Sequence, residues 1–112
     1  MIFALALASN KQQQQNFSFA YAQLAGLGRV EFSPIYQIPC RDGVGADYWN
    51  AACLLHSQHS VAAIIAYLKK LEQQSGRVRP SHQISLDIDV IAWGGSLVDM
   101  QFNPKKLPLA LD

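Results

Sequence analysis

The chain has 112 residues, half of them hydrophobic and 15% charged, which is typical of one compact globular domain and excludes an intrinsically disordered chain. Its net charge of +1 offers no general attraction to nucleic acid or to an anionic membrane, so we expect neither as a partner. Two cysteines are too few for a small disulfide-stapled secreted domain, which favours reduced thiols and a cytoplasmic location. We therefore expect residues 1–112 to form a single domain.

The first third of the chain predicts a strand, a helix and a second strand. Met1–Ala8 is apolar at almost every position, as in a central strand. Ser9 or Asn10 is expected to cap the helix that follows. Arg29–Pro39 alternates as a strand, and Pro34 within it predicts an edge position or a bulge. The apolar stripe of the intervening helix consists of Phe17, Ala20, Tyr21 and Leu24.

The middle of the chain repeats this alternation. A glycine-bearing loop, Cys40–Ala46, leads into a third strand at Asp47–His56. A second helix begins at His59 or Ser60, and Gly76–Gln83 forms a polar loop behind it. The apolar face of this helix consists of Val61, Ile64, Ile65, Leu68 and Leu71.

The last part predicts a strand at Ile84–Gly95 and a short strand near Leu97–Phe102. The element order is then β-α-β-β-α-β with one extra strand. This order indicates an α+β, ferredoxin-like fold, in which an antiparallel sheet carries two helices on one face. The opposite face of the sheet is available to a ligand, but the fold alone does not specify which one.

Asp87 and Asp89 are the first candidate site. Side chains alternate along a strand, so both carboxylates share a face with their Cα atoms roughly 6–7 Å apart. At an effective dielectric near 20 their repulsion is about 2.5 kcal/mol, which a bound cation would offset. Mg²⁺ is the natural candidate, because it is often held by one or two protein carboxylates beside substrate phosphates. The alternative is a solvated strand surface, which is the commoner origin of so short a motif.

A basic cluster precedes the aspartates and comprises Lys69, Lys70, Arg77 and Arg79. The two arginines alternate in an extended loop, so both guanidinium groups can bind phosphate oxygens. His82 in the same loop is a weaker phosphate candidate. Carboxylates for Mg²⁺ beside arginines for phosphates are what phosphoryl-type transfer requires. The alternative is that these cations only favour the helix C-terminus and solubility.

A third candidate, the sequence DYWN, opens the strand at Asp47–Asn50. The Asn50 amide offers a donor and an acceptor suited to the edge of a heterocycle, and the aromatic residues offer stacking faces. The alternative is that Asn50 satisfies local backbone groups.

Taken together, these stretches resemble the hydroxymethyl-dihydropterin pyrophosphokinases, which transfer a pyrophosphoryl group from ATP to a pterin alcohol in folate biosynthesis. The resemblance covers most of the chain, in the family's order and at nearly its spacing. The matching stretches are ALASN (Ala6–Asn10), YQIP (Tyr36–Pro39), DYWNAACLL (Asp47–Leu55), EQQSGRVR (Glu72–Arg79) and LDIDVIAWGG (Leu86–Gly95).

The resemblance implies roles for individual residues. Asp87 and Asp89 are expected to hold the Mg²⁺ that bridges the ATP phosphates. Asn50 is expected to bind the edge of the pterin ring, in a pocket lined by Tyr48, Ile38 and Pro39. The expected catalytic residues are Arg77, Arg79, Asp87 and Asp89. Contacts with ATP are expected from Lys69, Glu72, Arg77, Arg79 and His82.

The chain departs from the family pattern at several points. Ala8 replaces a glycine, and Ile84 stands where an arginine is usual, after a shortened loop. The family also continues beyond Leu107–Asp112 with a Pro-His segment and further phosphate-binding residues. These departures keep open an alternative, a non-catalytic descendant that binds a pterin or nucleotide, or that binds a protein through its exposed sheet. They also predict apolar surface that a second copy of the chain could cover, giving a homo-oligomer.

Overall fold

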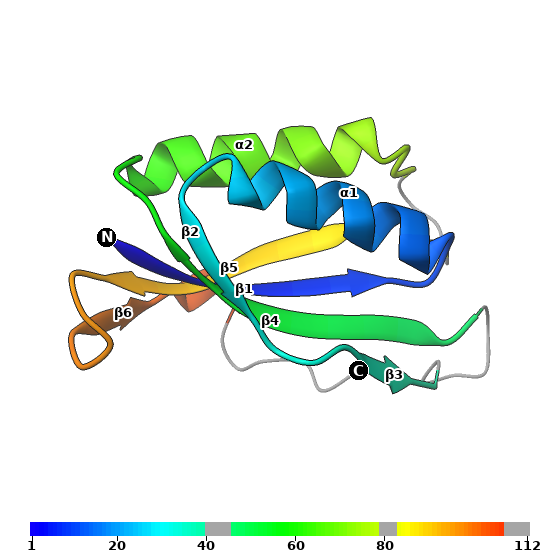
Figure 1. The fold of residues 1–112 in the computed structure, drawn as a ribbon, viewed down its shortest axis with the longest axis horizontal. Helices are drawn as coiled ribbons and strands as arrows, with labels where there is room; N and C mark the ends of the chain where they lie inside the picture. Colours follow the sequence, from blue (N-terminus) through cyan, green and yellow to red (C-terminus); the bar gives the residue numbers. More distant parts are fainter. Residues whose placement is uncertain (40–45, 79–82, 107–112) are drawn as a thin grey trace.

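The computed structural model describes residues 1–39, 46–78 and 83–106, in which two helices lie on one face of a six-stranded antiparallel sheet (Figure 1). This arrangement confirms the α+β, ferredoxin-like fold. The elements in chain order are β1 (Ile2–Ser9), α1 (Gln13–Ala25), β2 (Arg29–Phe32), β3 (Tyr36–Ile38), β4 (Tyr48–His56), α2 (Val61–Gln74), β5 (Asp87–Gly94), β6 (Met100–Phe102) and the 3₁₀ helix η1 (Pro104–Lys106). No helix in these ranges is both long enough and apolar enough to span a bilayer.

The sheet order is β2-β4-β1-β5-β6, which puts β1 at the centre between β4 and β5. The strand predicted at Arg29–Pro39 is split into β2 and β3, which both pair with β4. Ser33 holds the break together: its backbone N–H donates to Ala52 O at 2.9 Å, and its Oγ accepts from Ala52 N at 2.9 Å. β2 is an edge strand, as Pro34 predicts.

The predicted cap of α1 is wrong, whereas the predicted start of α2 at His59 or Ser60 agrees with the structure, in which Ser60 directly precedes the helix. The residue before α1 is Gln12, in the left-handed region (φ 46°) and without a side-chain cap. Asn10 pairs with Ile84 instead, because its backbone N–H donates to Ile84 O at 2.9 Å and its Oδ1 accepts from Ile84 N. Ser60 caps α2, with Oγ accepting from Ala63 N at 3.1 Å.

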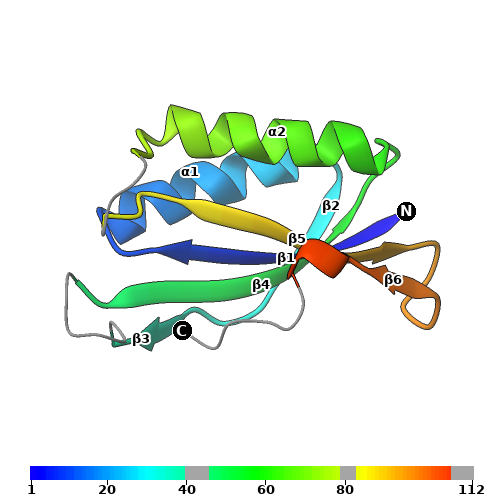
Figure 2. The ribbon, with the colours of Figure 1, turned by 180° about the vertical axis from the view of Figure 1, so that it is seen from behind.

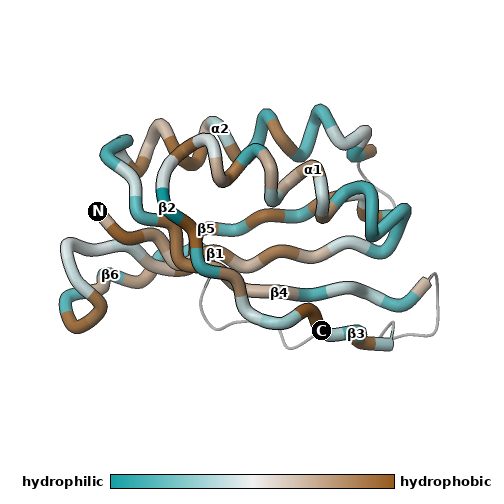
Figure 3. The backbone as a smooth tube through the Cα atoms, viewed as in Figure 1, coloured by the Kyte–Doolittle hydropathy of each residue, from teal (hydrophilic) through white to brown (hydrophobic). Residues whose placement is uncertain are grey.

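The hydrophobic core lies between the helices and the inner face of the sheet. Successive residues of β1 alternate, so Phe3, Leu5 and Leu7 are buried against the helices while the alanines between them face away. The first turns of α1, in the glutamine run, are hydrophilic, as Figure 3 shows. Cys53 is a free, buried thiol, and burial raises its pKa to about 12. Because the alanines of β1 face away from the helices, the outer face of the sheet has small side chains at its centre. We call this set the alanine floor: Ala4, Ala6, Ala8 and Ala52.

Candidate active site

Three residues form one row across the centre of the outer face. Ala8 of β1 pairs with Asn50 on one side and with Asp87 on the other. The adjacent row, which includes Leu7 and Ile88, belongs to the core, so the row of Ala8 points away from the helices. Two strand spacings separate Asn50 from Asp87, about 10 Å. In the register of the sheet, the residue between them is Ala8, whose side chain is small.

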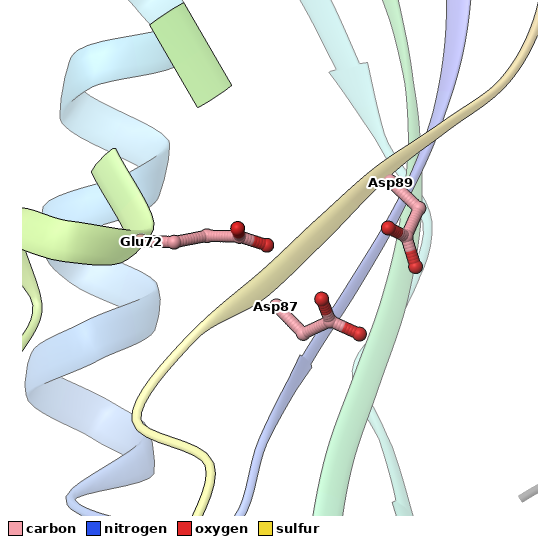
Figure 4. Close-up of side chains that lie close together, drawn as sticks. All are labelled: Glu72, Asp87 and Asp89. Carbon is pink, nitrogen blue, oxygen red and sulfur yellow. The ribbon is translucent and has the colours of Figure 1, made fainter. Parts of the chain in front are cut away.

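The two aspartates meet a third carboxylate at the edge of β5. Figure 4 shows Asp87 and Asp89 projecting from β5 while Glu72 reaches toward them from α2. One oxygen of each carboxylate lies within 4.8 Å of the other two. All three residues are partly or largely buried. The prediction from strand alternation is that the aspartates share a face, and the structure adds Glu72 to them. A set of carboxylate oxygens suits a hard divalent cation such as Mg²⁺.

Glu72 is the most deeply buried of the three carboxylates. It is only 9% exposed, and its Oε2 accepts a hydrogen bond from Ile88 N at 2.9 Å. Burial raises the pKa of Glu72 to about 7, an effect that the Ile88 hydrogen bond opposes and that Asp87 reinforces. Because burial is the main cause of this shift, the charged form of Glu72 is costly where it lies, and a bound cation would favour that charged form.

Arg77 brings positive charge to the same place. Its Nη1 lies 3.5 Å from Asp87 Oδ1 and also donates to Leu86 O at 3.1 Å. The side chain is 11% exposed, and its Nε is buried without a hydrogen-bond partner among the described residues. Because an unpaired buried donor is costly, this guanidinium is suited to bind a further anion, to which it would donate.

Hydrogen bonds to the backbone at the edge of β5 fix these side chains in position. β6 pairs with β5 only at Ala92–Gly94, so no strand among the described residues covers most of the β5 edge. Side chains satisfy that edge instead: Arg77 binds Leu86 O, Glu72 binds Ile88 N, and Asn103 Nδ2 donates to Val90 O at 2.9 Å. Backbone groups at a sheet edge need such partners. The residues proposed for chemistry thus also complete the sheet.

A pocket of about 590 Å³ lies between α2 and this edge. Its lining includes all three carboxylates, the cations Lys69, Arg77 and Lys105, and an apolar wall. That wall consists of Ile65, Leu68, Ile88, Val90 and Trp93. The combination suits a ligand with an anionic part and an apolar, planar part.

Of the residues predicted to bind ATP, the structure brings Lys69, Glu72 and Arg77 into this pocket. Arg79 and His82 lie outside the described residues. Sequence reasoning missed Trp93, Asn103 and Lys105, which also line the pocket. The only local signal for them is the Asn-Pro step at residues 103–104, which marks a turn directly after β6.

The residues predicted to bind the pterin gather on the outer face. β3 pairs with β4 so that Ile38 is opposite Tyr48 and Tyr36 is opposite Asn50. Tyr48 and Asn50 are two residues apart on one strand and therefore point the same way. Pro39 follows Ile38 directly. The Nδ2 of Asn50 is buried and has no hydrogen-bond partner among the described residues, which is costly unless a ligand or a water supplies an acceptor.

Comparison with known proteins identifies the family of the chain. A search of curated proteins finds no match. A family model described as 7,8-dihydro-6-hydroxymethylpterin-pyrophosphokinase matches residues 4–110, nearly the whole chain, and confirms the resemblance drawn from the sequence. The chain therefore belongs to the 7,8-dihydro-6-hydroxymethylpterin-pyrophosphokinase family.

Proposed function

We propose that the protein transfers a pyrophosphoryl group from ATP to 6-hydroxymethyl-7,8-dihydropterin in folate biosynthesis, with Mg²⁺ at the carboxylates. One observation carries the proposal: Asn50 and Asp87 share a row on the outer face of the sheet, about 10 Å apart. A bicyclic ring held at Asn50 spans that gap and presents its hydroxymethyl arm to phosphates held at Asp87. Membership of the pyrophosphokinase family supports the same reaction class.

The proposed metal ligands are Asp87 and Asp89, with Glu72 within reach of the same ion. When bound, Mg²⁺ would neutralise part of the triphosphate charge and orient it. Arg77 holds Asp87 at 3.5 Å and has a further donor free for a phosphate oxygen. Its role in the proposal is therefore both to position the carboxylate and to stabilise the charge that develops on the phosphates.

The proposed pterin site uses the outer face. The Asn50 amide donates to an acceptor on the ring edge and thereby satisfies its unpaired Nδ2. The ring lies on the alanine floor, between Tyr48 and Ile38 on one side and the carboxylates on the other. The hydroxyl oxygen attacks the β-phosphorus in line, the bond from that phosphorus to the α-bridging oxygen breaks, and AMP leaves.

The experiment is to incubate the purified protein with ATP, Mg²⁺ and hydroxymethyl-dihydropterin and to measure AMP and the pyrophosphorylated pterin. Asp87→Ala should abolish the reaction, and Asp99→Ala should not change it, because Asp99 is exposed on the β5–β6 turn. Pterin binding without AMP would favour the non-catalytic descendant. Absence of both turnover and ligand binding would contradict the proposal and favour a protein-interaction role.

A further inference from the structure

A bulge in β5 brings the chain's next segment to the pocket. Ala4 pairs with Ala92 whereas Leu5 pairs with Val90, so Ile91 is an extra residue on β5. Asn103 binds this bulge twice: its backbone N–H donates to Ile91 O at 2.8 Å and its Nδ2 donates to Val90 O at 2.9 Å. Asn103 is buried, so this attachment is a fixed part of the fold.

The attachment determines where η1 begins. The Lys105 backbone N–H donates to Asn103 Oδ1 at 3.1 Å, so the same side chain that binds the bulge also caps η1. Figure 2 shows η1 beside β5, against which it packs. Lys105 is thereby held at the pocket that contains Asp87 and Asp89.

The ammonium group of Lys105 has no ion-pair partner within the described part of the chain. Arg77 lies against Asp87, whereas Lys105 forms no ion pair with any described residue. Lys69, on the α2 side of the pocket, is likewise without an ion pair in the described ranges. A triphosphate remains anionic when one divalent cation is bound, and two lysines on different walls of its pocket complement that remaining charge.

We propose that Lys105 is a further phosphate-binding residue of the nucleotide site, placed there by Asn103 and the β5 bulge. This inference rests on the proposed function, because it presupposes that the pocket binds a nucleotide. It adds a contact that neither the basic loop nor the acidic strand supplies. Lys105 acts by charge and position and takes no part in bond breaking.

The test measures binding of Mg²⁺ with a non-hydrolysable ATP analogue by calorimetry, at low and at high salt. Lys105→Met keeps the length of the side chain and removes its charge; we expect about tenfold weaker binding, with a reduced dependence on salt. Lys105→Arg restores the charge and should bind within about twofold of the wild type. The matched control is Lys11→Met, since Lys11 is exposed and lines none of the described pockets.

Each other outcome overturns the inference for a stated reason. Wild-type affinity in Lys105→Met would remove Lys105 from the site and leave the proposed function intact. Weak binding in both Lys105→Met and Lys105→Arg would indicate that the residue only shapes η1. Equal weakening by Lys11→Met would indicate general surface charge. If the wild type itself binds no nucleotide, the proposed function fails and the role of Lys105 fails with it.

Discussion

Backbone groups that pair with no neighbouring strand are satisfied differently at the outer edge of β2 and at the part of the β5 edge that β6 does not reach. Along β2, exposed charged side chains keep the edge in water, and Arg29 and Glu31 lie 3.9 Å apart with most of each side chain exposed. Along β5, Arg77 and Glu72 are largely buried and bind the backbone directly. An edge that is only hydrated tolerates change, whereas an edge completed by buried charges fixes those charges in position. This difference explains why the candidate site lies at β5.

The largest difference between the two edges is expected in the rate of AMP formation after substitution of an arginine, and Arg77→Ala should lower that rate most. It removes a positively charged group beside Asp87, and the loss of one such group from a transfer site lowers the rate by about 10²–10³-fold. Arg29→Ala on the β2 edge should change the rate by less than about twofold. Steady-state formation of AMP measures both, with circular dichroism to establish that each variant is folded. Equal rates for the two variants would contradict the assigned role of Arg77.

The pH dependence of stability should distinguish the edges next. Because the pKa of folded Glu72 is raised from 4.5 to about 7, the folded protein binds more protons than the unfolded chain between these values. In the presence of a chelator, the free energy of unfolding should therefore fall by about 3 kcal/mol as pH rises from about 4.5 through about 7. Urea unfolding at a series of pH values measures this. Glu72→Gln should flatten the decline, and so should Mg²⁺; the Glu31→Gln control should not.

Asn103→Ala should destabilise the protein more than an ordinary surface substitution does. It leaves Val90 O without its partner and removes the cap from Lys105, a loss of about 1–2 kcal/mol. Gln101→Ala, an exposed position on the neighbouring strand, should lie within about 0.5 kcal/mol of the wild type. Denaturant unfolding compares the two. Equal stability of the two variants would show that Asn103 does not hold the bulge.

Most of the order of elements, and the placement of Asp87 and Asp89 on one face of a strand, could be predicted from the sequence, because both follow from periodicity within a single segment. The surroundings of Glu72 could not, since its burial depends on how α2 packs against β5. The resemblance to the family supplied that residue where periodicity did not. The β5 bulge is one extra residue in an otherwise regular alternation, so no local pattern reveals that Asn103 and Lys105 reach the pocket. The cap of α1 was predicted wrongly for a similar reason: Asn10 forms hydrogen bonds with Ile84, which is distant in sequence, and no local pattern reveals such a contact.

The smallest expected effect is on the β2 edge itself. Arg29 contacts Glu31 at 3.9 Å and the ring of His56 at 3.3 Å, and all of these groups are accessible to solvent. A double-mutant cycle with Arg29→Met and Glu31→Gln should therefore give a coupling energy below about 0.5 kcal/mol, decreasing further with added salt. The corresponding cycle between Arg77 and Asp87 should give a larger and less salt-sensitive value, since both partners are largely shielded from water. If the two couplings were equal, burial would not be what distinguishes the β5 edge, and the fixed geometry assigned to the carboxylate site would lose its physical basis.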